Sequence, residues 1–62
     1  MFRCYFTQGG HIVMGDDLDV ATLEAAISVA QKLLAERSQA HALDGIEIWS
    51  GTKLLYKSGG AV

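Results

Sequence analysis

Proline, paired cysteines and long apolar runs are all missing from this chain. Its 62 residues include no proline and one cysteine, Cys4, so an internal disulfide is excluded. Chains of this length bury little surface and usually gain stability from a disulfide, a metal or self-association. The sequence also offers no converging set of metal ligands, so self-association is the route that remains. Cys4 lies in an apolar segment and is expected to be a small core residue in a reducing compartment.

An excess of charge of one sign is missing too. Five basic and seven acidic residues give a formal net charge of −2, and the absence of a basic stripe argues against nucleic-acid binding. No run approaches the roughly 18 apolar residues of a membrane span, and "MFRCYF" is too short for the apolar part of a signal peptide. Half of the residues are nonetheless hydrophobic. We therefore expect a folded, soluble, cytoplasmic protein that does not bind membranes.

The start of the chain has the pattern of an antiparallel hairpin. Apolar and polar residues alternate in "FRCYFT", which is typical of a half-buried strand. A second strand follows "QGG", and residues 8–10 are expected to form a three-residue loop in which glycine supplies positive φ. In that register Phe6 pairs with Ile12 and Cys4 pairs with Met14.

A helix of about 20 residues is predicted after an acidic connection. Thr22 is the expected N-cap and Glu24 suits the positive end of the helix dipole. Apolar residues then recur at helical spacing on one side, as far as His41 at the last turn.

The second half of the chain predicts another hairpin. "IEIW" and "KLLYK" flank "SGT", which is expected to be a three-residue loop. Ile48 then faces Leu54, and Ile46 faces Tyr56. Residues 1–57 are thus expected to form a single α+β domain with a ββαββ order, in which one helix packs on one face of a four-stranded, largely antiparallel sheet; residues 58–62 are expected to be a flexible tail. The predicted core consists of Phe2, Cys4, Phe6, Ile12, Met14, Leu23, Ile27, Ala30, Leu34, Ile46, Ile48, Leu54 and Tyr56.

The side chains that could take part in catalysis or bind a metal do not assemble into a recognisable site. His11 beside two glycines opens a strand, whereas a phosphate-binding loop opens a helix. "DDLD" begins like a calcium loop, but Thr22 and Ser28 stand where glycine and a bidentate glutamate belong, so a solvated acidic loop is expected. A metal site from His11, His41 and Cys4 would need side chains that the strand pattern separates. We therefore expect no enzyme, no cofactor and no bound metal.

One sheet face should stay uncovered, because the single helix covers only the other. The side chains expected there include Tyr5, Val13, Trp49 and Leu55, surrounded by charged residues. Such a patch indicates a dimer or partner surface with aromatic anchors. The predicted function is a non-catalytic interaction module that self-associates or binds a protein partner, whose identity and pathway the sequence does not give.

Resemblances to known families imply the same ββαββ order and add two alternative functions, a toxin-binding domain and a sulfur carrier. The order "YF…GG…TLEAA…LLAE…IEIW…G" resembles a group of short uncharacterised bacterial proteins, common in soil alphaproteobacteria, in which Thr22 is usually aspartate. That resemblance implies a ββαββ unit without catalytic residues. A weaker likeness, in the strand, glycine, strand start and the "TLEA" helix, is to the N-terminal part of HicB-type antitoxins, which implies a toxin-binding domain as an alternative. Ubiquitin-like sulfur carriers share the element order and a terminal Gly-Gly, but Gly59 and Gly60 would become terminal only after trimming.

Overall fold

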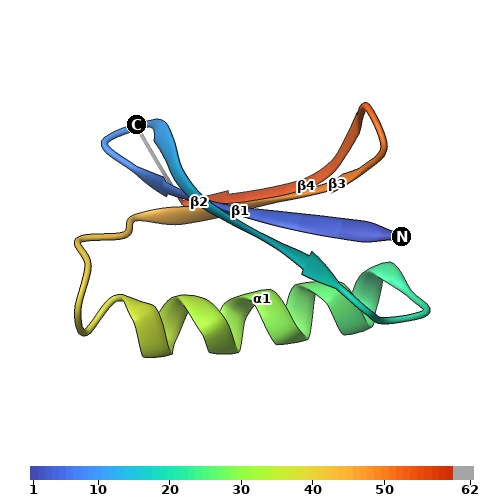
Figure 1. The fold of residues 1–62 in the computed structure, drawn as a ribbon, viewed down its shortest axis with the longest axis horizontal. Coiled ribbons are helices and arrows are strands. Elements are labelled where there is room, and N and C mark those ends of the chain that lie inside the picture. Colours follow the sequence, from blue (N-terminus) through green and yellow to red (C-terminus); the bar gives the residue numbers. More distant parts are fainter. Residues whose placement is uncertain (60–62) are drawn as a thin grey trace.

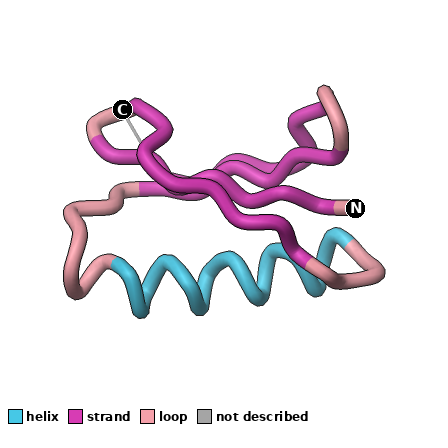
Figure 2. Tube along the Cα trace, in the orientation of Figure 1, coloured by secondary structure: helices cyan, strands magenta, loops and turns pink. Residues whose placement is uncertain are grey.

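A computed structural model describes residues 1–59 of the chain. The elements follow one another as β1 (Phe2–Gln8), β2 (His11–Leu18), α1 (Leu23–Arg37), β3 (Gly45–Ser50) and β4 (Lys53–Gly59). The strands form one antiparallel sheet in the order β2-β1-β3-β4, and α1 runs along one face of it (Figure 1). The predicted α+β class and ββαββ order are confirmed. Figure 2 shows that the two hairpin turns rise at opposite ends of the sheet, away from the helix.

The first hairpin turns on two residues, so the predicted three-residue loop is wrong. Gly9 and Gly10 have φ of 59° and 83°, and positive φ at both central residues suits the right-handed twist of the flanking strands. Gln8 pairs with His11, and the register shifts by one residue beyond this pair. Val13 is the extra residue of this bulge, because Met14 already pairs with Phe6.

That combination of turn and bulge preserves most of the predicted face assignment. Beyond the bulge each β2 residue is displaced by two positions from the predicted register, so Met14 stays on the helix side. Between turn and bulge the displacement is one position, so Ile12 pairs with Thr7 and is 52% exposed. The prediction that Ile12 belongs to the core is therefore wrong. β2 also continues through the expected acidic loop to Leu18, which is buried.

The second hairpin repeats this arrangement. Its strands flank residues 51 and 52, and Gly51 has a φ of 60°. Trp49 pairs with Leu54 and Ile48 pairs with Tyr56, so Leu55 is the extra residue. The predicted three-residue loop required Leu54 to be buried, but Leu54 is 42% exposed. The prediction that Leu54 belongs to the core is therefore wrong.

The C-terminal boundary also differs from the prediction. β4 runs to Gly59, which pairs with Gly45. Residues 58 and 59 therefore belong to the sheet and not to a tail. Gly60, Ala61 and Val62 lie outside the described residues.

The helix is shorter than expected but begins where predicted. The hydroxyl of Thr22 accepts a hydrogen bond from the backbone of Ala25 at 3.1 Å, as an N-cap should. α1 has 15 residues and ends at Arg37, so His41 lies in the connection to β3. A helix of this length spans about 22 Å.

Small residues let the helix approach the sheet closely. Ala26 and Ala30 are fully buried on its inner side, and the larger Ile27 and Leu34 pack around them while partly buried. The fully or nearly fully buried core is Cys4, Phe6, Leu18, Ala26, Ala30, Ile46 and Ile48. Every other predicted core residue except Ile12 and Leu54 packs against it.

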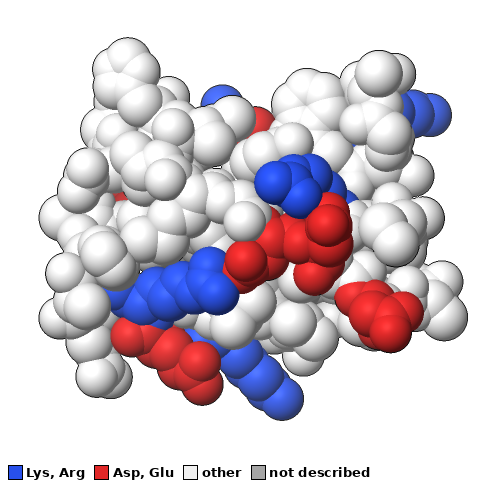
Figure 3. Space-filling model, viewed as in Figure 1, with Lys and Arg blue, Asp and Glu red and all other residues white. Residues whose placement is uncertain are grey.

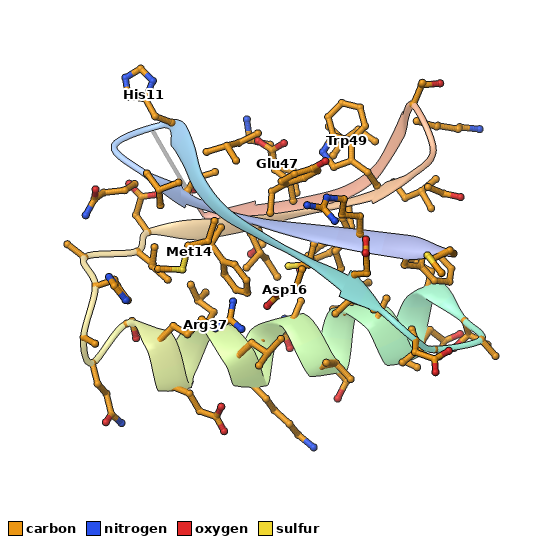
Figure 4. All side chains as sticks on the ribbon, viewed as in Figure 1. His11, Met14, Asp16, Arg37, Glu47 and Trp49 are labelled. Atoms are coloured by element: carbon orange, nitrogen blue, oxygen red, sulfur yellow. The ribbon has the colours of Figure 1, made fainter. Side chains whose placement is uncertain are left out.

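An ion pair fastens the end of the helix to the sheet. Arg37 contacts Asp16 of β2 at 2.5 Å and lies over the ring of Phe6, 5.0 Å from its centroid. Asp16 and Arg37 both lie between the helix and the sheet (Figure 4). Asp16 therefore has a structural contact in a strand, in place of the expected solvated loop. No helix within residues 1–59 is long and apolar enough to cross a bilayer.

Candidate functional site: the open sheet face

The sheet face opposite α1 carries a continuous set of aromatic and charged side chains, and we call it the open face. Its rows follow from the strand register. In one row Arg3 lies between Asp17 and Trp49, and Trp49 pairs with Leu54; in the next row Tyr5 lies between Gly15 and Glu47, and Glu47 pairs with Lys57. Trp49 and Glu47 project away from the helix (Figure 4).

Arg3 connects one edge of this face to its centre. Its guanidinium contacts Asp17 of β2 at 2.6 Å and donates from Nε to the hydroxyl of Tyr5 at 3.0 Å. It also lies 5.2 Å from the centroid of the Tyr5 ring, which is within cation–π distance. The hydrogen bond to Asp17, followed by the one to Tyr5, raises the pKa of Arg3 above its usual value. Arg3 is therefore a permanent positive charge beside the tyrosine.

Gly15 makes room for the Tyr5 ring. A Cβ atom at position 15 would lie 3.0 Å from Cδ1 and 3.1 Å from Cε1 of Tyr5, and 3.2 Å from Nη2 of Arg3. These distances are shorter than ordinary van der Waals contact between such atoms. The ring therefore rests directly against the backbone of β2. Glycine is needed at position 15 because the Tyr5 ring lies so close to the backbone, and not because of an unusual backbone φ angle.

Trp49 is held by Tyr5 and by an acidic neighbour. The two rings meet edge to face, with centroids 6.5 Å apart and an interplanar angle of 86°, which is a favoured aromatic geometry. The indole Nε1 donates to Oε1 of Glu47 at 3.1 Å, and Nζ of Lys57 lies 4.0 Å from Oε2 of Glu47. A connected chain of contacts thus crosses all four strands, from Asp17 at one edge to Lys57 at the other.

The structure places the predicted surface residues in two different settings. Tyr5 and Trp49 lie together near the centre of the open face. Val13 and Leu55 are the extra residues of the two bulges, Val13 being 47% exposed and Leu55 partly buried. Leu54, which was predicted to lie in the core, lies on the open face beside Trp49. The two-residue turn "GT" is the signal that would have revealed it, because that turn shifts Leu54 by one position.

Asp44 forms a second polar cluster, which the sequence analysis did not single out. Its carboxylate accepts hydrogen bonds from Oγ1 of Thr7 at 2.8 Å and from the backbone N–H of Gly9 at 2.6 Å. Its own backbone N–H donates to the carbonyl oxygen of Thr7 at 2.9 Å. Thr7 is 3% exposed, so Asp44 satisfies a buried hydroxyl and fixes the first turn to the segment before β3.

The remaining reactive side chains lie apart from one another. His11 projects from the first hairpin (Figure 4) and His41 is exposed in the connection after α1. Cys4 is fully buried, and this burial, followed by the negative charge of Asp16, raises the pKa of its thiol to about 11. In the part of the chain that the structure describes, no three histidine, cysteine, aspartate or glutamate side chains converge as metal ligands, and no pocket is present.

Comparisons with protein-family models, curated proteins and solved structures give no match to this chain. The geometry of the open face is therefore the basis for assigning a function.

Proposed function

We propose that this chain is a non-catalytic interaction module that binds a protein surface through its open face. The protein bound is a second copy of the chain or another protein. The observation that carries this proposal is the Tyr5–Trp49 pair, which is fixed by a network of charged neighbours on a sheet face that no other element among residues 1–59 covers.

Rigid aromatic side chains at the centre of a surface are the usual energetic anchors of protein interfaces. Each aromatic ring contributes in proportion to the apolar area it loses to solvent, at about 25 cal/mol per Å². Association entropy and the ordering of side chains offset part of this gain. Here the ordering cost is small, because Trp49 is already held by Glu47 and Tyr5 is already held by Arg3 and Gly15. The charged rim around the pair matches the usual anatomy of an interface.

Replacing Trp49 by glutamate tests the proposal. Trp49→Glu removes the anchor and introduces a charge beside Glu47, so we expect at least a tenfold weaker affinity for whatever the open face binds, consistent with the loss of an interface hot spot. Gln31→Glu is the matched control, because it adds one negative charge on the exposed side of α1. Sedimentation velocity measures self-association, and binding to an isolated native partner is measured by calorimetry.

The proposal is contradicted if Trp49→Glu self-associates as strongly as the wild type and Gln31→Glu. If the wild type is a monomer, the proposal is contradicted when the native partner binds Trp49→Glu and Gln31→Glu equally well. Circular dichroism on both variants establishes that they remain folded.

A further inference from the structure

The step from Asp44 to Gly45 is the one place in the sequence where glycine follows aspartate. The other aspartates, Asp16, Asp17 and Asp19, are followed by aspartate, leucine and valine, and the chain has no asparagine. The carboxyl group of an aspartate reacts with the backbone nitrogen of the next residue when the two meet. Glycine in second place favours the reaction, because it has no Cβ to obstruct the approach and allows the widest range of backbone angles. Asp44 is therefore the aspartate of the unfolded chain that is most exposed to this reaction.

The reaction needs no partner other than water. The backbone nitrogen of Gly45 attacks Cγ of Asp44; the N–Cγ bond forms, the Cγ–O bond breaks, and the N–H proton leaves with the hydroxyl group as water. A five-membered succinimide ring results. Water then opens this ring at one of its two carbonyl carbons. Opening at Cγ restores aspartate, and opening at the α-carbonyl carbon leaves isoaspartate, in which the main chain runs through the former side chain.

The contacts of the Asp44 carboxylate oppose ring closure in the folded chain. Oδ1 accepts a hydrogen bond from Oγ1 of Thr7 at 2.8 Å, and Oδ2 accepts one from the backbone N–H of Gly9 at 2.6 Å. Both oxygens are thus bound to β1 and the first turn. Ring closure draws Cγ onto the nitrogen of Gly45, so the carboxyl group must give up both hydrogen bonds, and the loss leaves the buried Thr7 hydroxyl without its acceptor.

The backbone at this step is held as firmly as the side chain. Gly45 is buried and pairs with Thr7 of β1 on one side and with Gly59 of β4 on the other. A Cβ atom at position 59 would overlap the carbonyl oxygen of Asp44, so β4 packs directly against the Asp44–Gly45 peptide. The backbone rotations that bring Cγ and nitrogen together therefore require at least a local opening of the sheet.

We propose that Asp44 is a site of spontaneous isoaspartate formation which the fold keeps closed, so that the modification occurs in chains that have unfolded. Isoaspartate at position 44 adds one carbon to the main chain directly before Gly45 and attaches the carboxylate to Cα. The pairs of Gly45 and the hydrogen bond to Thr7 then no longer fit, so a modified chain refolds to a less stable form. The site lies apart from the Tyr5–Trp49 pair, and the inference does not rest on the proposed function.

The other aspartates are controls within the same chain. Asp16 and Asp17 lie against arginine side chains, and Figure 3 shows acidic and basic groups side by side on the surface. Trypsin cuts after lysine and arginine, so residues 4–32 carry these two with Asp19, whereas residues 38–53 carry Asp44 as their one aspartate. A single digest therefore compares Asp44 with the other three, and electron-transfer fragmentation in the mass spectrometer distinguishes isoaspartate from aspartate.

Incubation of the wild type for several weeks at neutral pH, folded in buffer and unfolded in guanidinium chloride, tests the proposal. In the unfolded chain we expect isoaspartate to form faster at Asp44 than at the other aspartates, and Gly45→Ala to slow it several-fold. A domain of this size is unfolded about 1% of the time or less, so the folded chain should react at least about a hundredfold more slowly, since only the open population reacts. Equal rates in the folded and unfolded chain overturn the proposal, and so does an unfolded chain without preference for Asp44.

Variants separate the contact with Thr7 from the general stability of the fold. Thr7→Val removes the hydroxyl donor, and Ile27→Ala is the control because it destabilises the packing of the helix. At denaturant concentrations where both are unfolded to the same extent, Thr7→Val should form isoaspartate several-fold faster, whereas Thr7→Ser keeps a hydroxyl and should react like the wild type. Equal rates in Thr7→Val and Ile27→Ala overturn the role of the Thr7 contact.

The modified chain provides a second readout, which needs no variant. Reversed-phase chromatography separates chains with isoaspartate at position 44 from unmodified chains, and both are then refolded. The modified chains should unfold at a lower denaturant concentration by circular dichroism, because the main chain before Gly45 no longer fits the sheet. The same midpoint for both would show that the modification leaves the fold intact, and it would overturn the inferred loss of stability.

Discussion

Replacing Asp44 by alanine should destabilise the domain by about 2 to 4 kcal/mol, because two hydrogen bonds to a charged acceptor are lost. The two donors differ in their access to water once the carboxylate is removed. Gly9 is exposed and its N–H can bind water, whereas Thr7 is 3% exposed as a residue and its hydroxyl is left without a partner. The Thr7 contact therefore accounts for most of the loss. A domain of this size has only about 3 to 9 kcal/mol of total stability, so the variant should be close to unfolded at 37 °C.

Urea unfolding followed by far-UV circular dichroism measures this effect. Asp44→Asn keeps one carbonyl acceptor and should lose about half as much stability as Asp44→Ala. Thr7→Val removes the hydroxyl, so the double variant should be destabilised by less than the two single variants together. Asp19→Ala serves as the control, since Asp19 is an exposed aspartate before the helix. A coupling energy below about 0.5 kcal/mol between Asp44 and Thr7 would refute this reasoning.

Two further predictions concern buried and close-packed positions. Gly15→Val should displace the Tyr5 ring, which the Cβ at position 15 would contact; near-UV circular dichroism should lose part of its aromatic signal, and an unchanged spectrum would show that the ring does not rest on Gly15. The pKa of the Cys4 thiol is about 11 in the folded chain against a reference value of 9.0, so the unfolded chain loses its proton first. The stability is then complete below pH 9 and falls by about 2 to 3 kcal/mol as the pH rises to 11. Cys4→Ala should lack this part of the pH dependence in urea titrations at several pH values.

The element order was predictable because two periodicities in the sequence are clear. Alternation in "FRCYFT" and "IEIW" indicates strands buried on one side, and the spacing of apolar residues after Thr22 indicates a helix. Both predicted hairpin registers were displaced by two residues beyond the bulges. A displacement of two leaves every side chain on its original face, so most core residues were identified correctly although their predicted partners were wrong.

The two bulges were the part that local patterns could not specify. Ile12 and Leu54 lie between a two-residue turn and a bulge, where the displacement is a single position. A bulge has no strong sequence signal, since it depends on how the strand packs as a whole. Asp44 was missed for a related reason, because its partner Thr7 lies 37 positions earlier in the chain.

The open face was predictable in its aromatic centre but not in its charge pattern. Alternation alone puts Tyr5 and Trp49 on the same side of the sheet. The spatial sequence from Asp17 to Lys57 requires the strand order, which places β1 and β3 in the middle of the sheet. That order brings Arg3 and Glu47 between the two edge strands, and no local pattern in the chain contains this information.

The two bulges have a common consequence for the open face. Each moves one large apolar side chain, Ile12 or Leu54, from the predicted core to the exposed side, at opposite ends of the sheet. A chain of 62 residues has a thin core. Two large apolar side chains that remain in water therefore deprive the monomer of about 25 cal/mol of stabilisation for every Å² of apolar area that stays exposed. A surface that covers the Tyr5–Trp49 pair and extends to both raised ends would recover that area. The exposed positions of Ile12 and Leu54 therefore favour a partner that spans the whole face over one that contacts the aromatic centre alone.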